Sequence, residues 1–132
     1  MSKCRLSDQP SHAYVAQFDP PSLRDQPDCA ELEITVGDHS FYVGFPVSTP
    51  DIPPSLMETA RTVLSQIVEL DAIACRDIDG RREDGELFGI DILSEHAVDL
   101  RYSAVSWNSD WPEMFERDAS GPWVHKGVRK FG

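Results

Sequence analysis

One amphipathic segment, residues 54–75, constrains most strongly how this chain can fold. Its sequence is PSLMETARTVLSQIVELDAIAC, and its apolar residues recur at steps of three and four, which places them on one face of a helix. Ser55 precedes Glu58 by three residues, as in a capping box, and two prolines stand where a first helical turn tolerates them. We therefore predict one long helix that must pack on a sheet. Its predicted apolar face consists of Leu56, Ala60, Val63, Leu64, Ile67, Leu70 and Ala74.

Segments with alternating apolar and polar residues lie on both sides of this helix. Such alternation is typical of strands with one buried face. A bulge at Gly89 is expected to interrupt it once. The predicted strands are residues 12–18, 29–36, 40–47, 86–93, 97–107, 112–118 and 122–131, with a proline-rich loop at 19–28 and a turn at 37–39.

The short connections between these strands favour antiparallel pairing. The expected fold class is therefore α+β, an antiparallel sheet of about six strands packed on one long helix in the order βββ-α-ββββ. The length of 132 residues fits a single domain, residues 1–132, in which residues 1–10 are expected to form a flexible arm.

The charge of the chain is strongly unbalanced. Twelve Lys and Arg residues stand against 23 Asp and Glu residues, which gives a net charge of −11 and a pI near 4.6. An acidic surface repels nucleic-acid phosphates and anionic lipids, and it accelerates encounters with basic proteins. It is also compatible with a simple solvated surface. We expect a basic protein partner, and neither nucleic acid nor membrane.

The three cysteines, Cys4, Cys29 and Cys75, have irregular spacing and form no C-x-x-C pair. An odd number at such spacing favours free thiols in a reducing cytosol. The N-terminal residues contain no apolar core of a signal peptide, and no stretch approaches the roughly 18 apolar residues of a membrane span. We therefore expect a cytoplasmic protein.

No motif in the chain predicts catalysis. Cys75 falls at the negative end of the predicted helix, where a thiolate is disfavoured. The serines and glycines follow neither a nucleophile-elbow nor a phosphate-loop pattern, and the acidic segment 77–86 departs from the calcium-loop spacing. We expect no catalytic residue, no metal and no cofactor. The four histidines, which lack metal-ligand spacing, are His12, His39, His96 and His125.

Two groups of residues are candidates for binding a partner. The first is the acidic loop that follows the predicted helix. The second surrounds two tryptophans that we expect to be partly exposed within an acidic rim, whereas Phe115 and Trp123 are expected in the core. The candidate partner-binding residues are Asp79, Glu83, Asp84, Glu86, Trp107, Asp110, Trp111 and Glu113.

Residues 100–124 carry a resemblance to a known group of proteins. They have the sequence LRYSAVSWNSDWPEMFERDASGPWV, in which Asn108 and Trp111 form an Asn-x-x-Trp loop and Gly121 and Trp123 a Gly-x-Trp hairpin. This segment, about a fifth of the chain, resembles the C-terminal signature of small acidic bacterial immunity-type proteins of polymorphic toxin systems. The resemblance implies a cytoplasmic protein that binds and neutralises a cognate toxin and has no catalytic residues.

The first functional hypothesis is thus an immunity-type protein that occludes the basic surface or active site of a toxin. The second is an adaptor or secretion-accessory module that self-associates through an apolar patch, which light scattering would reveal. The third is a small enzyme or ligand-binding domain that uses a concave sheet face, which requires polar groups converging in a pocket.

Overall fold

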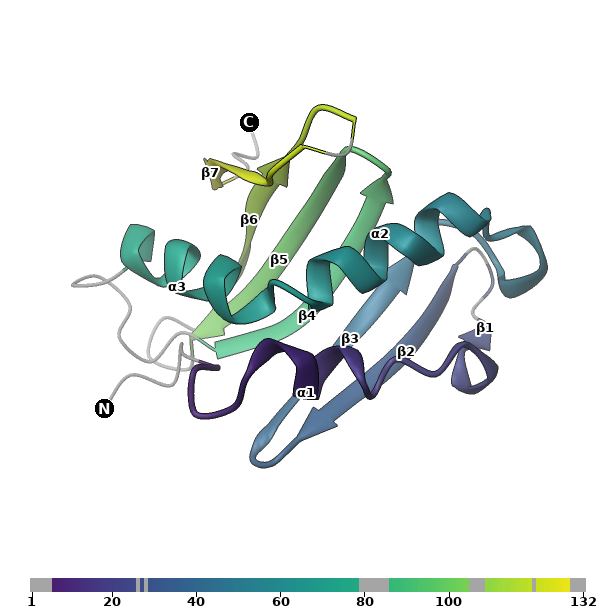
Figure 1. Ribbon diagram of the computed structural model, residues 1–132, viewed down its shortest axis with the longest axis horizontal. Helices are drawn as coiled ribbons and strands as arrows, with labels where there is room; N and C mark the ends of the chain where they lie inside the picture. Colours follow the sequence, from purple (N-terminus) through teal and green to yellow (C-terminus); the bar gives the residue numbers. More distant parts are fainter. Residues whose placement is uncertain are drawn as a thin grey trace.

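The computed structural model describes residues 6–25, 27, 29–78, 86–104, 109–119 and 121–128. Within these ranges the chain forms three α-helices and one sheet of seven strands (Figure 1). The helices are α1 (Ser11–Val15), α2 (Pro54–Leu64) and α3 (Ile67–Ile78), with 3-10 turns η1 (Pro20–Ser22) and η2 (Thr49–Asp51). The strands are β1 (Arg24–Asp25), β2 (Ala30–Val36), β3 (His39–Phe45), β4 (Glu86–Ser94), β5 (Ala97–Ala104), β6 (Ser109–Glu116) and β7 (Val124–Val128).

The strands lie side by side in sequence order, and only the β3–β4 pair is parallel. This pair has three register positions, Tyr42↔Gly89, Val43↔Ile90 and Gly44↔Asp91. The expected antiparallel sheet of about six strands on one long helix is therefore wrong, because the sheet is mixed. Short loops do exclude parallel pairing, but the segment that contains α2 and α3 is itself long enough to return the chain in the same direction.

The single long helix is also wrong, because the chain leaves the helix at Ser65 and begins another at Ile67. The Ser65 hydroxyl donates to the carbonyl of Thr62 at 2.7 Å, and such bonds to the preceding turn bend a helix. The Val68 N–H donates to Ser11 Oγ at 3.0 Å. Ser11 thus satisfies a backbone donor in the first turn of α3, as a capping side chain does.

The predicted apolar face of residues 54–75 is confirmed, since all seven of its side chains are buried. The predicted capping box is wrong. Pro53 is the N-cap of α2, without a side-chain cap, and Pro54 takes the first helical position. Periodicity therefore located the buried face correctly even though the helix is interrupted.

The N-terminal segment differs from the expectation of a strand at residues 12–18. Residues Ser11–Val15 form α1, and Tyr14 is fully buried with its hydroxyl donating to the Leu6 carbonyl at 3.0 Å. Seven alternating residues also fit a short helix with one buried aromatic. The described part of the expected arm, residues 6–10, packs on α3, because Leu6 is buried and its N–H donates to Asp71 Oδ2 at 2.9 Å.

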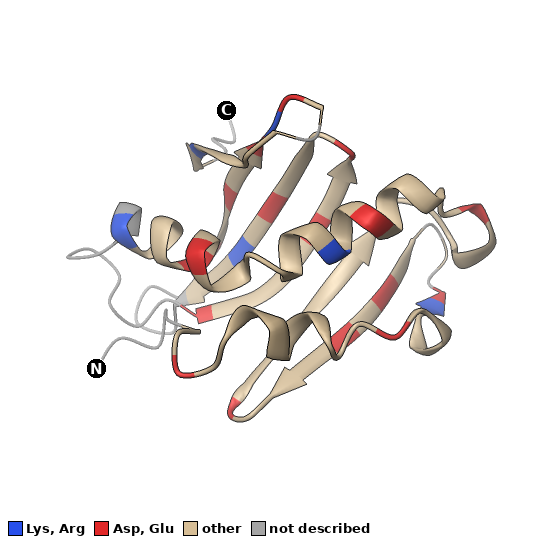
Figure 2. Ribbon diagram, viewed as in Figure 1, with Lys and Arg blue, Asp and Glu red and all other residues tan. Residues whose placement is uncertain are grey.

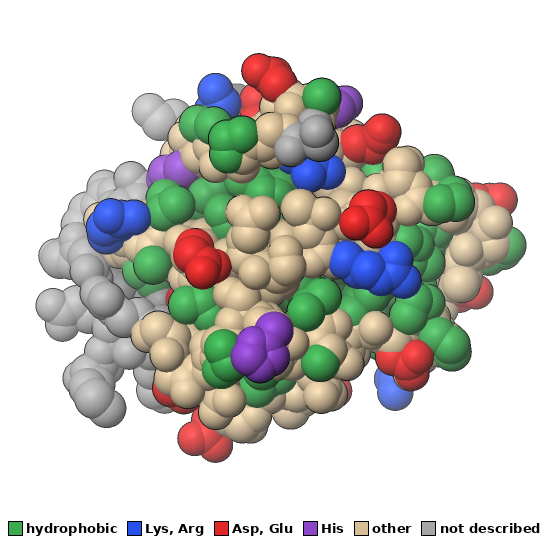
Figure 3. Space-filling model, in the orientation of Figure 1, with side chains coloured by type: hydrophobic (Ala, Val, Ile, Leu, Met, Phe, Trp, Pro, Cys, Tyr) green, Lys and Arg blue, Asp and Glu red, His purple; other side chains and the backbone are tan. Residues whose placement is uncertain are grey.

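All three α-helices cover the same face of the sheet (Figure 1), and the core lies between them and the strands. Seen from this side, charged side chains are scattered between apolar ones (Figure 3). No helix in the described ranges is long and apolar enough to cross a membrane. We call the opposite face of the sheet the outer face; it is defined by its residues below.

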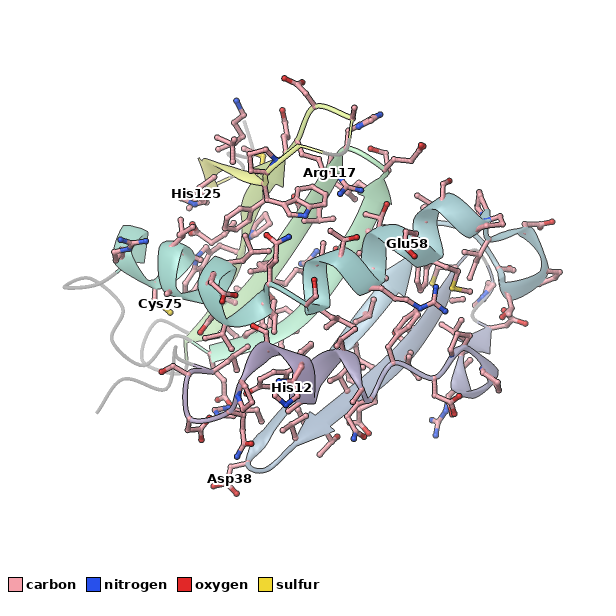
Figure 4. All side chains as sticks on the ribbon, viewed as in Figure 1. His12, Asp38, Glu58, Cys75, Arg117 and His125 are labelled. Atoms are coloured by element: carbon pink, nitrogen blue, oxygen red, sulfur yellow. The ribbon has the colours of Figure 1, made fainter. Side chains whose placement is uncertain are left out.

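The cysteines differ from the expectation of three free thiols. Cys75, on α3 (Figure 4), is disulfide-bonded, whereas Cys29 is a free, half-buried thiol. The reason for the error is that an odd number of cysteines only requires one to be unpaired, and sequence spacing does not reveal which pair meets in space.

Candidate functional site

The outer face between β2 and β5 is built by strand alternation. Residues whose side chains point to the helices are apolar, and those one position away point outward. The strand register aligns these outward positions in two rows that cross the four strands β2 to β5. Figure 2 shows acidic positions on β2 and β5. One row is Glu33, Tyr42, Gly89 and Arg101, and the next row is Glu31, Gly44, Asp91 and Asp99.

Arg101 is the one cation in these two rows, and two carboxylates share it. Its Nη1 lies 3.1 Å from Asp91 Oδ2, and its Nη2 lies 3.6 Å from Asp110 Oδ1 on β6. Its guanidinium carbon also lies 5.7 Å from the centre of the Phe88 ring. These groups are partly exposed, so each ion pair contributes at most about 1 kcal/mol to stability. The face therefore keeps an excess of negative charge around Arg101.

A hollow of about 310 Å³ lies at the centre of this arrangement. Gly44 and Gly89 form part of its lining without side chains, and Tyr42 is 47% exposed beside them. A Cβ on Gly44 would lie 3.4 Å from Asp91 Oδ1, so the glycine leaves room next to the carboxylate. Aromatic rings and carboxylates around one hollow are the chemistry that binds a cationic side chain. The lining residues are Glu31, Tyr42, Gly44, Phe88, Gly89, Asp91, Arg101 and Asp110.

A second polar cluster lies inside the molecule, between α3 and the strands β5 to β7. Asp71 Oδ1 accepts a hydrogen bond from the Tyr102 hydroxyl at 2.5 Å. Glu113, which is fully buried, accepts one from Trp111 Nε1 at 3.0 Å, and its Oε1 lies 2.7 Å from His125 Nε2. Burial, together with the charges of Asp71 and Glu113, raises the pKa of Tyr102 well above 10. These carboxylates are satisfied from within, so the cluster is structural.

A further hollow, of about 590 Å³, lies beside the connection between β6 and β7. Its Arg117 (Figure 4) is already engaged, because Nε donates to the Glu95 carbonyl at 2.9 Å and the guanidinium carbon lies 4.5 Å from the centre of the Trp123 ring. The other charged residues of its lining have both signs, namely Glu116, Asp118 and Lys126, and His96 also lines it. In the described part of the chain, no three or more His, Cys, Asp or Glu residues gather as a metal site.

The predicted binding residues differ in their exposure. Glu86 is exposed at the start of β4, and Asp110 is exposed and pairs with Arg101. The expected exposure of Trp111 and its neighbour Glu113 is wrong, because both are buried against the helices. The four residues outside the described ranges are Asp79, Glu83, Asp84 and Trp107.

The error at Trp111 and Glu113 has a physical origin that the sequence contained. Both lie at even spacing from Phe115, which was predicted to be in the core, and in a strand that spacing means the same face. Charge suggested exposure for Glu113, but its partners Trp111 and His125 permit burial. The outer-face residues Tyr42, Phe88 and Arg101 were missed, although the outward pattern of Glu31 and Glu33 on β2 indicated that face.

Fold and site together define an α+β protein whose helices cover one face of a mixed sheet and whose other face carries acidic and aromatic side chains. No family model, no curated protein and no solved structure matches the chain.

Proposed function

We propose that this chain is a protein-binding module of the immunity type, which binds a basic toxin domain on the outer face and occludes its basic surface or active site. The observation that supports the proposal is the outer face itself. It combines Asp91 and Asp110 around one arginine with the half-exposed ring of Tyr42, and the helices leave it uncovered. The net charge of −11 has the sign that a basic partner requires.

The mechanism requires no chemical step. The negative field of the molecule accelerates the encounter, and a lysine or arginine of the partner enters the hollow between Tyr42 and Asp91. There it competes with Arg101 for the carboxylates of Asp91 and Asp110. The acidic loop residues Asp79, Glu83 and Asp84 stay a prediction as additional contacts.

The location of the protein belongs to this proposal. A cytoplasmic protein is the prediction from the sequence, and it stays a prediction. The disulfide of Cys75 is an observation against it, because reducing compartments keep most thiols reduced.

The experiment is to purify the chain with the product of the neighbouring gene and to measure association and dissociation rates across salt concentration. We expect fast association at low salt that slows steeply as salt rises. The double variant Glu33→Lys, Asp110→Lys should reduce the association rate about tenfold or more at low salt. The control is Glu58→Lys on α2, an exposed carboxylate on the helix-covered face, and the effects are compared per reversed charge.

Equal effects of the outer-face variant and the control would refute the outer face as the binding surface. A complex insensitive to salt, or no complex with any basic protein, would refute the proposed function. Reversible self-association seen by light scattering in the absence of a partner would favour the adaptor hypothesis instead.

A further inference from the structure

One edge of the sheet is only partly covered. The edge strand β1 has two residues, which pair with Glu31 and Ala30 at the start of β2. The five residues 32–36 of β2 have no strand partner on that side within the described chain. An edge strand that presents free backbone groups is a template for pairing with another chain.

The register shows which backbone groups point outward along this edge. β2 and β3 are joined by a two-residue turn, with Val36 opposite His39, so this pair and every second pair exchange hydrogen bonds. The N–H and C=O groups of Glu33 and Thr35 therefore point away from β3. Among the described residues, no other segment makes a backbone hydrogen bond to either of them. The two N–H groups and two C=O groups of Glu33 and Thr35 thus have the spacing at which an added strand can form hydrogen bonds with them.

The opposite edge of the sheet is different, because β7 is protected against pairing. Its register with β6 shifts between Met114 and Phe115, and Gly127 has a φ of 91°. Lys126 stands exposed on the same strand. Bulges and edge lysines are devices that prevent edge-to-edge association. β2 pairs with β3 without any register shift, so of the two sheet edges in the described ranges, only the β2 edge keeps the regular geometry of a strand acceptor.

Charge and shape at the β2 edge indicate what binds there. Glu31 and Glu33 project on its outer face, so a second copy of this chain pairing β2 with β2 would set carboxylates against carboxylates. On the helix side, the partly buried Val15 and Leu23 pack against the core. A hollow of about 130 Å³ at this edge can receive one side chain of the added strand. Its lining is Ser22, Arg24, Glu31, Leu32, Glu33 and Tyr42.

We propose that an extended segment of the partner, with lysine or arginine alternating with apolar residues, pairs with β2 as an additional strand. This inference rests on the proposed function and names the form in which the basic partner presents itself. The main-chain groups of Glu33 and Thr35 hold the segment, a basic side chain of the segment faces Glu33, and its apolar side chains face the helix layer.

The test uses the full chain and an acetylated, amidated heptapeptide in which lysine and valine alternate. Amide hydrogen exchange is followed residue by residue by NMR. Binding should slow exchange about tenfold or more at the amides of Glu33 and Thr35 at saturating peptide. A peptide of the same composition with its lysines in one block should leave both amides unprotected.

Two variants make the test specific to the edge. Thr35→Pro removes one outward donor and should abolish protection at Glu33, and circular dichroism verifies that it folds. Glu33→Lys, which keeps every backbone donor, should weaken peptide binding about tenfold or more, whereas Glu58→Lys should not.

The outcomes separate this inference from the proposed function. Binding of the alternating peptide without protection of Glu33 and Thr35 overturns the edge inference and leaves the outer-face proposal standing. Protection of both amides without peptide, rising with protein concentration, overturns it in favour of a second copy. Protection in the Glu33→Lys variant equal to that of the unchanged chain overturns the role of charge in selecting the segment.

Discussion

Asp71 and Glu113 are two of the buried carboxylates of this acidic protein, and side-chain or backbone donors hold both of them. Asp71 accepts from Tyr102 and from the Leu6 backbone, and Glu113 accepts from Trp111. A buried carboxylate is strongly unfavourable unless such partners are present. These residues therefore fix how α3, the N-terminal segment and the last strands meet.

Glu113→Ala is expected to destabilise the protein by about 1–3 kcal/mol, because it leaves the buried Trp111 Nε1 without its acceptor. Urea denaturation measures the loss. The control is Glu116→Ala on the same strand, an exposed carboxylate whose removal should change stability by less than about 0.5 kcal/mol. Equal losses for the two variants would show that burial of Glu113 is not what matters.

The phenol of Tyr14 makes stability sensitive to alkaline pH. Burial first, and then the charges of Asp8 and Asp71, raise its pKa from 10.0 to about 12. The folded state thus prefers the neutral phenol, so its contribution is complete below pH 10 and is lost as the pH rises through about 12. Melting temperatures of the unchanged chain and Tyr14→Phe between pH 9 and pH 12 check this. The variant should lose less stability over that interval, and parallel curves would contradict the assignment.

At the scale of elements, the sequence predicted the buried face of the segment 54–75 better than it predicted where its helices begin and end. The apolar periodicity of residues 54–75 placed every predicted core residue correctly, because burial follows side-chain spacing. The break at Ser65 was harder to predict, since no glycine or proline marks it. The local bond from the Ser65 hydroxyl to the Thr62 carbonyl is common to many helical serines, and the contact that caps α3 comes from Ser11, far away in the sequence. The same limit applies to the parallel β3–β4 pair, which depends on how the helices fold back.

A comparison of two serines tests the origin of this break. Ser11→Ala should cost about 0.5–2 kcal/mol, because it removes the acceptor of the Val68 N–H at the start of α3. Ser55→Ala should cost only a few tenths of a kcal/mol, because no side chain caps α2. Thermal denaturation of both variants measures the difference. A larger loss for Ser55 would restore the predicted capping box.

At the scale of the whole molecule, alkylation can test whether Cys75 forms a disulfide. In the unfolded chain without reductant, an alkylating reagent should modify Cys29 and leave Cys75 unmodified. After reduction both should react, and mass spectrometry of the peptides distinguishes the two states. Alkylation of Cys75 before reduction would show that Cys75 is a free thiol, and it would support the prediction of a cytoplasmic protein.

The parallel pair of β3 and β4 also determines in which order the chain can assemble. The β2–β3 hairpin and the strands β4 to β7 form from neighbours in sequence, so each can associate quickly. They meet at three register positions, which include Tyr42 and Asp91, after the long segment between them has closed. A partner that contacts both of these residues bridges the two halves of the sheet. Separation of the two halves would then require the partner to dissociate, so a bound partner would lengthen the lifetime of the folded chain.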